Sequence, residues 1–221
     1  MSESIAVSPD TSAARDALLK RVRGALGPVT NRENDYDAIP RAYTRTGVMA
    51  AADRLDLFEE RLREYDGGLY RVQAAELAST VARVLTLRGK RRIAIPRGLP
   101  AVWLPDGFSF ETADDLLAAE LDTFDGILTG CTVAIALTGS IVLQNAAAQG
   151  PRKLSLVPDY HLCILHADQI VETVAEAMDR LAPTAKLPTT FISGPSATAD
   201  IEMTRVKGVH GPRFLDAILV M

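Results

Sequence analysis

The fold is decided by one stretch of the sequence, residues 69–95, which reads LYRVQAAELASTVARVLTLRGKRRIAI. Its two ends, residues 69–72 and 92–95, are short apolar runs that predict β-strands. Between them, residues 74–87 carry apolar side chains at helical spacing and predict a helix. A strand, a helix and a second strand in this order predict a βαβ unit, in which the two strands are parallel.

The same alternation of strands and helices continues on both sides of this stretch. The further predictions are helices over residues 12–26, 51–62, 113–121 and 168–181, the last with Asp168 as N-cap and Ile170, Val171, Val174 and Met178 facing inward, and strands over residues 133–137, 141–143, 161–165, 190–192 and 217–220. We therefore expect an α/β fold with a mostly parallel, Rossmann-like sheet that is covered on both faces.

The amino-terminal region differs in character from the rest of the chain. After the helix predicted over residues 12–26, the pair Gly27-Pro28 ends the helical pattern, and residues 29–45 are largely polar. Such a segment predicts an extended arm, which would wrap either on the body of the protein or on a second subunit, so a homo-oligomer is left open. We expect an amino-terminal helix and arm over residues 1–45 and an α/β domain over residues 46–221.

The composition is that of an ordinary globular protein, with 48% hydrophobic and 24% charged residues. The formal net charge of −4 argues against binding to nucleic acid, because proteins that contact phosphate backbones carry a basic surface. No apolar run approaches the ~18 residues of a membrane span, and the amino terminus lacks the pattern of an export signal. We expect a cytoplasmic protein without a membrane span.

The cysteine and histidine content bounds the metal chemistry of the chain. The two cysteines, Cys131 and Cys163, lie in apolar runs, which favours buried reduced thiols in a reducing compartment. Two thiols cannot supply the four thiolates of an iron–sulfur cluster, and neither a Cys-x-x-Cys nor a His-x-x-x-His spacing occurs. We therefore expect neither an iron–sulfur cluster nor zinc on this chain, and any cluster must belong to a partner.

Polar residues that could bind a small anion follow three of the predicted strands. The sequence offers hydroxyl groups, glycine amides and two guanidinium groups, and the candidate ligand-binding residues are Thr138, Gly139, Ser140, Arg152, Gly194, Ser196, Gly211 and Arg213. In open α/β sheets, ligands bind outside the carboxyl ends of the strands. We expect these groups to converge there, although glycine-rich connections with a salt bridge are the alternative.

Candidate catalytic residues lie in the same carboxyl-terminal region. His210, between Gly208 and Gly211, is the best candidate for a general acid or base, and Asp200 or Glu202 could orient its ring. His161, at the start of a predicted apolar strand, is interpreted as a core histidine. The chain has no Walker loop, no Gly-x-Gly-x-x-Gly turn and no Gly-x-Ser-x-Gly elbow, so the sequence leaves the cofactor unknown.

An ordered series of motifs resembles a known family, the lactate utilization protein C family of LUD-domain proteins. The motifs are TGSIVL at residues 138–143, GPRKLSLVP at 150–158, His161, DQIV at 168–171, GPSATADIE at 194–202 and GVHGPR at 208–213. The amino-terminal helix and the arm around Pro40 are also similar, so the resemblance includes nearly the whole chain. An ordered series of this kind is far more specific than any one of its motifs.

The resemblance implies both a fold and a role. It implies a fold similar to that of ribose-5-phosphate isomerases and CoA-transferases, and a role in the oxidation of L-lactate to pyruvate beside an iron–sulfur oxidoreductase partner. It assigns no catalytic residues. Members of the family often have an acid directly before the Thr-Gly pair, where this chain has Leu137, so a catalytic step that needs this acid would be lost or relocated.

Two other functions are left open by the residues. The first is a stand-alone isomerase or acyl-CoA transferase, with Glu202 as nucleophile or base and with Arg152 and Arg213 holding a small anionic substrate. The second is a ligand-sensing or assembly module that performs no chemistry. Turnover by the purified protein alone would separate the first of these from a subunit of a lactate-oxidising complex.

Overall fold

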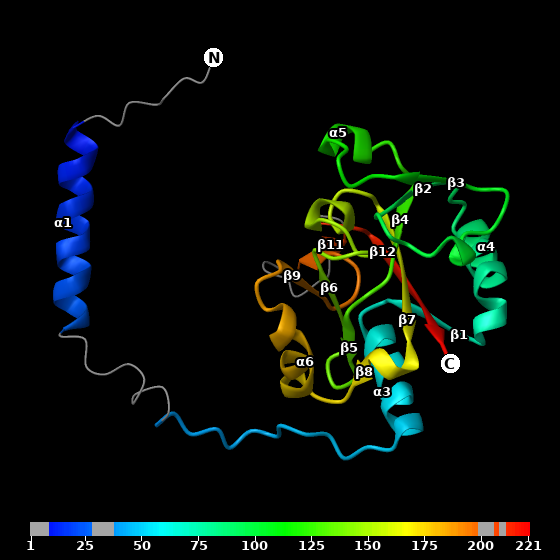
Figure 1. Cartoon of the computed structure of the whole chain (residues 1–221), viewed down its shortest axis with the longest axis horizontal. Helices are drawn as coiled ribbons and strands as arrows, with labels where there is room; N and C mark the ends of the chain where they lie inside the picture. The colour runs from blue at the N-terminus through cyan, green and yellow to red at the C-terminus, as the bar shows by residue number, and fades with distance from the viewer. Residues whose placement is uncertain (1–8, 28–37, 199–205, 208–210) are drawn as a thin grey trace. The chain divides into compact units, whose positions relative to one another are not determined.

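The computed structural model describes residues 9–27, 38–198, 206–207 and 211–221. The chain divides into two compact units, Met1–Tyr43 and Thr44–Met221. In the first unit, the predicted amino-terminal helix is present as α1 (Pro9–Leu26), which begins three residues earlier than expected (Figure 1). Leu18, Val22 and Leu26 of its apolar stripe are exposed.

A six-stranded sheet forms the centre of the second unit, and every neighbouring pair of its strands is parallel. In spatial order, its strands are β1 (Gly68–Val72), β12 (Phe214–Val220), β7 (Tyr160–His166), β4 (Gly126–Thr129), β2 (Arg92–Ile95) and β3 (Ser109–Thr112). The long strands β7 and β12 are almost wholly buried, as expected for parallel strands that are covered on both faces. The mostly parallel α/β fold is therefore confirmed.

Two helices cover opposite faces of this sheet. Helix α3 (Ala51–Glu64) packs Leu55, Phe58 and Leu62 against one set of β12 side chains, which includes Ala217. Helix α4 (Leu77–Leu87), preceded by the 3-10 turn η1 (Ala74–Glu76), packs against the alternate set, which includes Ile218. Because successive side chains of a strand point to opposite faces, the two helices lie on opposite sides of the sheet.

A second, four-stranded sheet lies on the α3 side of the molecule (Figure 1). Its spatial order is β8 (Ile170–Val171), β5 (Val133–Ile135), β6 (Ser140–Gln144) and β9 (Thr189–Ile192), with α6 (Val174–Leu181) packed against β5. Strands β5 and β6 form an antiparallel hairpin around the predicted turn, and β9 pairs antiparallel with β6. The short strands β10 (Ala197–Thr198) and β11 (Val206–Lys207) pair antiparallel after β9.

Several short elements lie in the connections between the longer helices and strands. They are α5 (Ala118–Leu121) and the 3-10 turns η2 (Ala101–Trp103), η3 (Arg152–Ser155), η4 (Ala167–Gln169) and η5 (Ala182–Thr184). The helix expected over residues 113–121 is limited to α5. Strand β4 was not anticipated, because its four residues are all buried and show no alternation.

The helix expected over residues 168–181 is wrong in its first half. Ile170 and Val171 form β8, which pairs parallel with β5, and the helix begins after Thr173. The Thr173 hydroxyl accepts a hydrogen bond from the amide of Glu176, so Thr173 is the N-cap in place of Asp168. Val174 and Met178 are exposed. Pairing with β5 thus outweighs the helical periodicity of the sequence.

Within the part of the chain that the structure describes, no helix is both long enough and apolar enough to cross a lipid bilayer.

Candidate functional site

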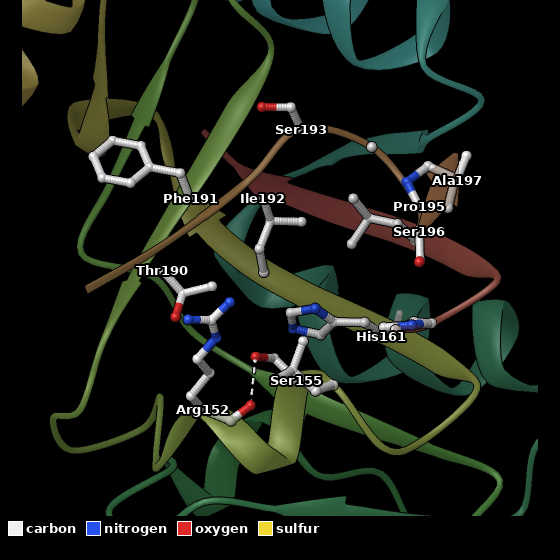
Figure 2. Close-up of a pocket in the computed structure, with 15 residues that line it drawn as sticks. Arg152, Ser155, His161, Thr190, Phe191, Ile192, Ser193, Pro195, Ser196 and Ala197 are labelled. Atoms are coloured by element: carbon white, nitrogen blue, oxygen red, sulfur yellow. Dashed lines mark hydrogen bonds between the residues drawn. The ribbon is translucent and has the colours of Figure 1, made fainter. Parts of the chain in front are cut away.

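A cavity of about 280 Å³ lies beside the amino ends of β7 and β12. Its walls come from η3, from the first residues of β7 and β12, and from β9 with the loop that follows it (Figure 2). We call this space the Arg152 cavity. Four of the predicted ligand-binding residues line it, namely Arg152, Gly194, Ser196 and Gly211.

The cavity lies at the edge of the six-stranded sheet opposite to the one where we expected the site. We expected the site at the carboxyl ends of the parallel strands, but His161 and Leu215, which line the cavity, are the second residues of β7 and β12. The expectation treated β9 as a strand of the parallel sheet. Because β9 belongs to the second sheet, its carboxyl end delivers Gly194 and Ser196 to the opposite edge of the first one.

Backbone contacts hold the two glycine-containing segments of the cavity together. The amide of Ser196 donates a 2.8 Å hydrogen bond to the carbonyl of Pro212. Gly194 has a φ of 80°, and a Cβ atom at this residue would lie 2.4 Å from Cβ of Tyr65 at the end of α3. The structure therefore requires glycine at residue 194 for packing, independently of any bound anion.

The Thr138-Gly139-Ser140 turn is connected to the cavity without lining it. The Thr138 hydroxyl donates to the Ser140 hydroxyl over 2.8 Å, and Ser140 Oγ lies 2.7 Å from Ser193 Oγ. Ser193 is a cavity residue, but its hydroxyl points away from His161 and Arg152 (Figure 2). The turn thus supports the loop after β9 through a chain of hydroxyl groups.

Arg213 does not line the cavity. Its guanidinium donates two hydrogen bonds to the carboxylate of Asp159, 2.5 and 3.0 Å long. These hydrogen bonds hold the pKa of the Asp159 carboxyl below its usual value. The structure thus places Arg213 in a partly exposed ion pair, which was the alternative that the sequence left open for this residue.

The three predicted catalytic residues, Asp200, Glu202 and His210, lie outside the described residues. Two described residues near them in the chain, Ala197 and Gly211, both line the cavity. The proposed roles of the three residues therefore stay predictions. The stand-alone isomerase or transferase depends on Glu202 and stays a prediction with them.

His161 is a cavity residue that the sequence did not single out as a functional one. It is buried in β7, as expected, and Thr129 Oγ1 on β4 lies 2.7 Å from its Nε2 atom. Burial lowers the pKa of His161 to about 4, so the ring is neutral near pH 7. The signal in the sequence was its place at the start of a strand, where a side chain can reach the edge of the sheet.

Arg152 supplies the positive charge among the described lining residues of the cavity. Among the described lining residues there is no acidic side chain, and within the described part of the chain no carboxylate pairs with the Arg152 guanidinium. Thr190 lies beside this guanidinium, and Ser155 lies close by (Figure 2). A cationic fork with neighbouring hydroxyl groups is suited to a small carboxylate or phosphate.

Metal binding finds no support in the described residues. They contain no cluster of three or more His, Cys, Asp or Glu side chains that could hold a metal ion. Cys131 and Cys163 are free and buried, and the neighbouring Cys163 thiol together with burial raises the pKa of the Cys131 thiol. A thiol held in its protonated form is a poor metal ligand.

Comparison with known proteins gives the family. The model of the LUD domain matches residues 55–220. The "Lactate utilization protein C" of Deinococcus radiodurans is 40% identical over 215 residues, which is 96% of this chain and 98% of that protein. The chain belongs to the LUD domain family. The "Lactate utilization protein C" of an Exiguobacterium species is 25% identical over 97% of this chain and 99% of its own length.

A solved structure supports the fold of this LUD domain. The crystal structure of a DUF162 family protein from Deinococcus radiodurans matches with a TM-score of 0.70 and 41% identity, and covers 79% of this chain and all of that one. Leu137, directly before the Thr138-Gly139 pair, is half exposed and does not line the Arg152 cavity of this LUD domain.

Proposed function

We propose that the protein acts in L-lactate utilization, in the oxidation of L-lactate to pyruvate, beside an iron–sulfur oxidoreductase partner in the cytoplasm. The observation that carries this proposal is the similarity to a protein named for lactate utilization, which extends over nearly the full length of both chains. A match over whole chains supports a shared role better than a match over one motif.

The chemistry of the Arg152 cavity supports the same proposal. L-Lactate and pyruvate are small monoanions, and the cavity offers one cation without a carboxylate partner among the described residues. The oxidation also requires an electron acceptor. The chain has only two cysteines, both buried, so the electrons would pass to a cluster on the partner.

Growth of a deletion strain tests the role. In a strain without a second lactate dehydrogenase, deleting the gene should abolish growth on L-lactate but not on pyruvate, and a plasmid copy should restore it. Affinity purification from lactate-grown cells should recover a cysteine-rich partner that carries the absorption of an iron–sulfur cluster. Unchanged growth of the deletion strain on L-lactate would contradict the proposal.

A further inference from the structure

We infer that the Arg152 cavity recognises a short monocarboxylate that carries an oxygen on C2, with Arg152 binding the carboxylate and His161 binding the C2 oxygen. Thr129 acts as a positioning residue for His161. The inference rests on the proposed function and deepens it, because it assigns substrate recognition to named atoms of this chain.

Arg152 provides the carboxylate site. It is the first residue of η3, and its guanidinium points into the cavity beside Thr190 (Figure 2). A guanidinium that is not paired with a protein carboxylate can form two parallel hydrogen bonds to the carboxylate of a ligand. The described lining residues include no second cation that could pair with a second carboxylate on the ligand.

His161 provides one hydrogen-bonding group in a fixed direction. Its Nε2 atom is held by Thr129, and the ring forms part of the cavity wall across from Arg152 (Figure 2). The other ring nitrogen, Nδ1, is therefore the atom left to bind a ligand. A hydroxyl group on C2 can donate or accept a hydrogen bond, so it fits either tautomer of the neutral ring.

The remaining wall limits the size of the ligand. The side chain of Ile192 projects into the cavity between Arg152 and His161 (Figure 2), and the buried Leu215 also lines the space. These side chains suit a methyl or other short apolar group on C2. The volume of about 280 Å³ lies at the low end of ligand pockets, which also favours a small ligand.

Titration calorimetry of the purified full chain with two probes separates the two contacts. L-Lactate and propionate have the same carbon skeleton and the same carboxylate, but only L-lactate has an oxygen on C2. The unsubstituted protein should bind L-lactate about tenfold more tightly than propionate, the difference expected for one hydrogen bond to a buried group. Succinate should bind more weakly than L-lactate, because its second carboxylate finds no cation among the described lining residues.

Substitutions should alter the two contacts independently. Arg152→Gln should lower the affinity for L-lactate and for propionate by about tenfold or more, since a charge-assisted pair is lost. His161→Phe should reduce the affinity for L-lactate to the affinity for propionate, and it should leave the affinity for propionate unchanged. Thr129→Val should lower the ratio of the affinity for L-lactate to that for propionate. Thr129→Ser should keep the ratio of the parent protein, because serine keeps the hydroxyl.

A matched control removes an arginine elsewhere. Arg63 on α3 pairs with Glu59 at an exposed site, so Arg63→Gln removes the same charge as Arg152→Gln and should leave both affinities unchanged. Thermal unfolding identifies any variant that fails to fold. If Arg152→Gln does not fold, Arg152→Lys replaces it. This variant should lower the affinity for both probes equally, because it keeps the charge but loses the two parallel hydrogen bonds of the guanidinium.

Three outcomes would overturn the inference. They are no binding of either probe, equal binding of L-lactate and propionate by the unsubstituted protein, and an Arg152→Gln variant that keeps the affinity of the parent. If the deletion strain still loses growth on L-lactate, the proposed function stands and only the assignment of Arg152 and His161 fails. If growth is unaffected, the proposed function fails whatever the affinities are.

Discussion

The carboxylate of Asp216 accepts two hydrogen bonds from the guanidinium of Arg88, each 2.7 Å long. Asp216 is fully buried in β12, and the Tyr160 hydroxyl donates a third hydrogen bond over 3.0 Å. The neighbours of these strand residues, His161 and Leu215, are paired in register and line the Arg152 cavity on the other face. The ion pair therefore fixes the strand ends on which the cavity is built.

Removing one partner of this ion pair should be costly. Arg88→Met leaves the buried Asp216 carboxylate without its cation and should lower the free energy of unfolding by about 3 kcal/mol. Tyr160→Phe removes one hydrogen bond and should cost about 1 kcal/mol. Urea denaturation measures both changes. As a control, Arg63→Met breaks an exposed ion pair within α3 and should lower the free energy of unfolding by about 0.3–0.5 kcal/mol. If Arg88→Met lowered it by no more than that, the buried ion pair would not be important for stability.

The buried imidazole of His161 should make stability depend on pH. The pKa of His161 is about 4 in the folded protein, against an ordinary value of 6.5. As the pH falls from 6.5 to 4, the unfolded chain takes up a proton that the folded chain does not, so the free energy of unfolding decreases by about 3 kcal/mol. In His161→Phe this contribution should be missing. Denaturation of both proteins across this pH range is the measurement, and parallel curves would show that His161 titrates normally.

Gly194 should be intolerant of any side chain. Gly194→Ala places a residue at a φ of 80° and drives its Cβ atom into Tyr65, so we expect a loss above the roughly 1–2 kcal/mol of left-handed strain alone. Gly107 has a φ of 87°, but a Cβ atom at this residue would have no neighbouring atom within 4 Å, so Gly107→Ala should show the strain alone. Equal losses in thermal or urea denaturation would mean that the contact with Tyr65 contributes nothing.

The segment that precedes α3 should depend on two glutamates. The Gly47 amide donates to Glu176 over 3.1 Å, and the Met49 amide donates to Glu172 over 2.7 Å. Replacing both acids by Gln weakens these charge-assisted hydrogen bonds, so the two amides should exchange with deuterium about tenfold faster. Hydrogen exchange measured by NMR reports each amide. The amide of Leu117, which donates to Glu120 elsewhere in the molecule, is the internal control; unchanged exchange at Gly47 and Met49 would show that other contacts hold the segment.

The sequence was informative about the site where the signal was local. Gly194 and Ser196 were singled out by the turn that follows β9, and Arg152 by its charge in a loop that follows another strand, and the structure brings all three into one cavity. His161 was missed as a site residue because a histidine in an apolar strand has the same local pattern whether or not its ring reaches a cavity. Arg213 was predicted to bind a ligand, because its partner Asp159 lies 54 residues away in the chain and the local sequence does not show that the two residues pair.

Local periodicity by itself determined the βαβ unit around α4, the buried strands β7 and β12 and the β5–β6 hairpin. The family motifs were likewise evident from residues that are near one another in the sequence. Only the tertiary structure decided that β9 joins the second sheet, that Ile170 and Val171 leave a helical pattern for a strand, and that the cavity opens at the amino ends of β7 and β12. The physical reason is that strand pairing and burial are settled by contacts between distant segments, and these can outweigh the weak local preferences of a short run of residues.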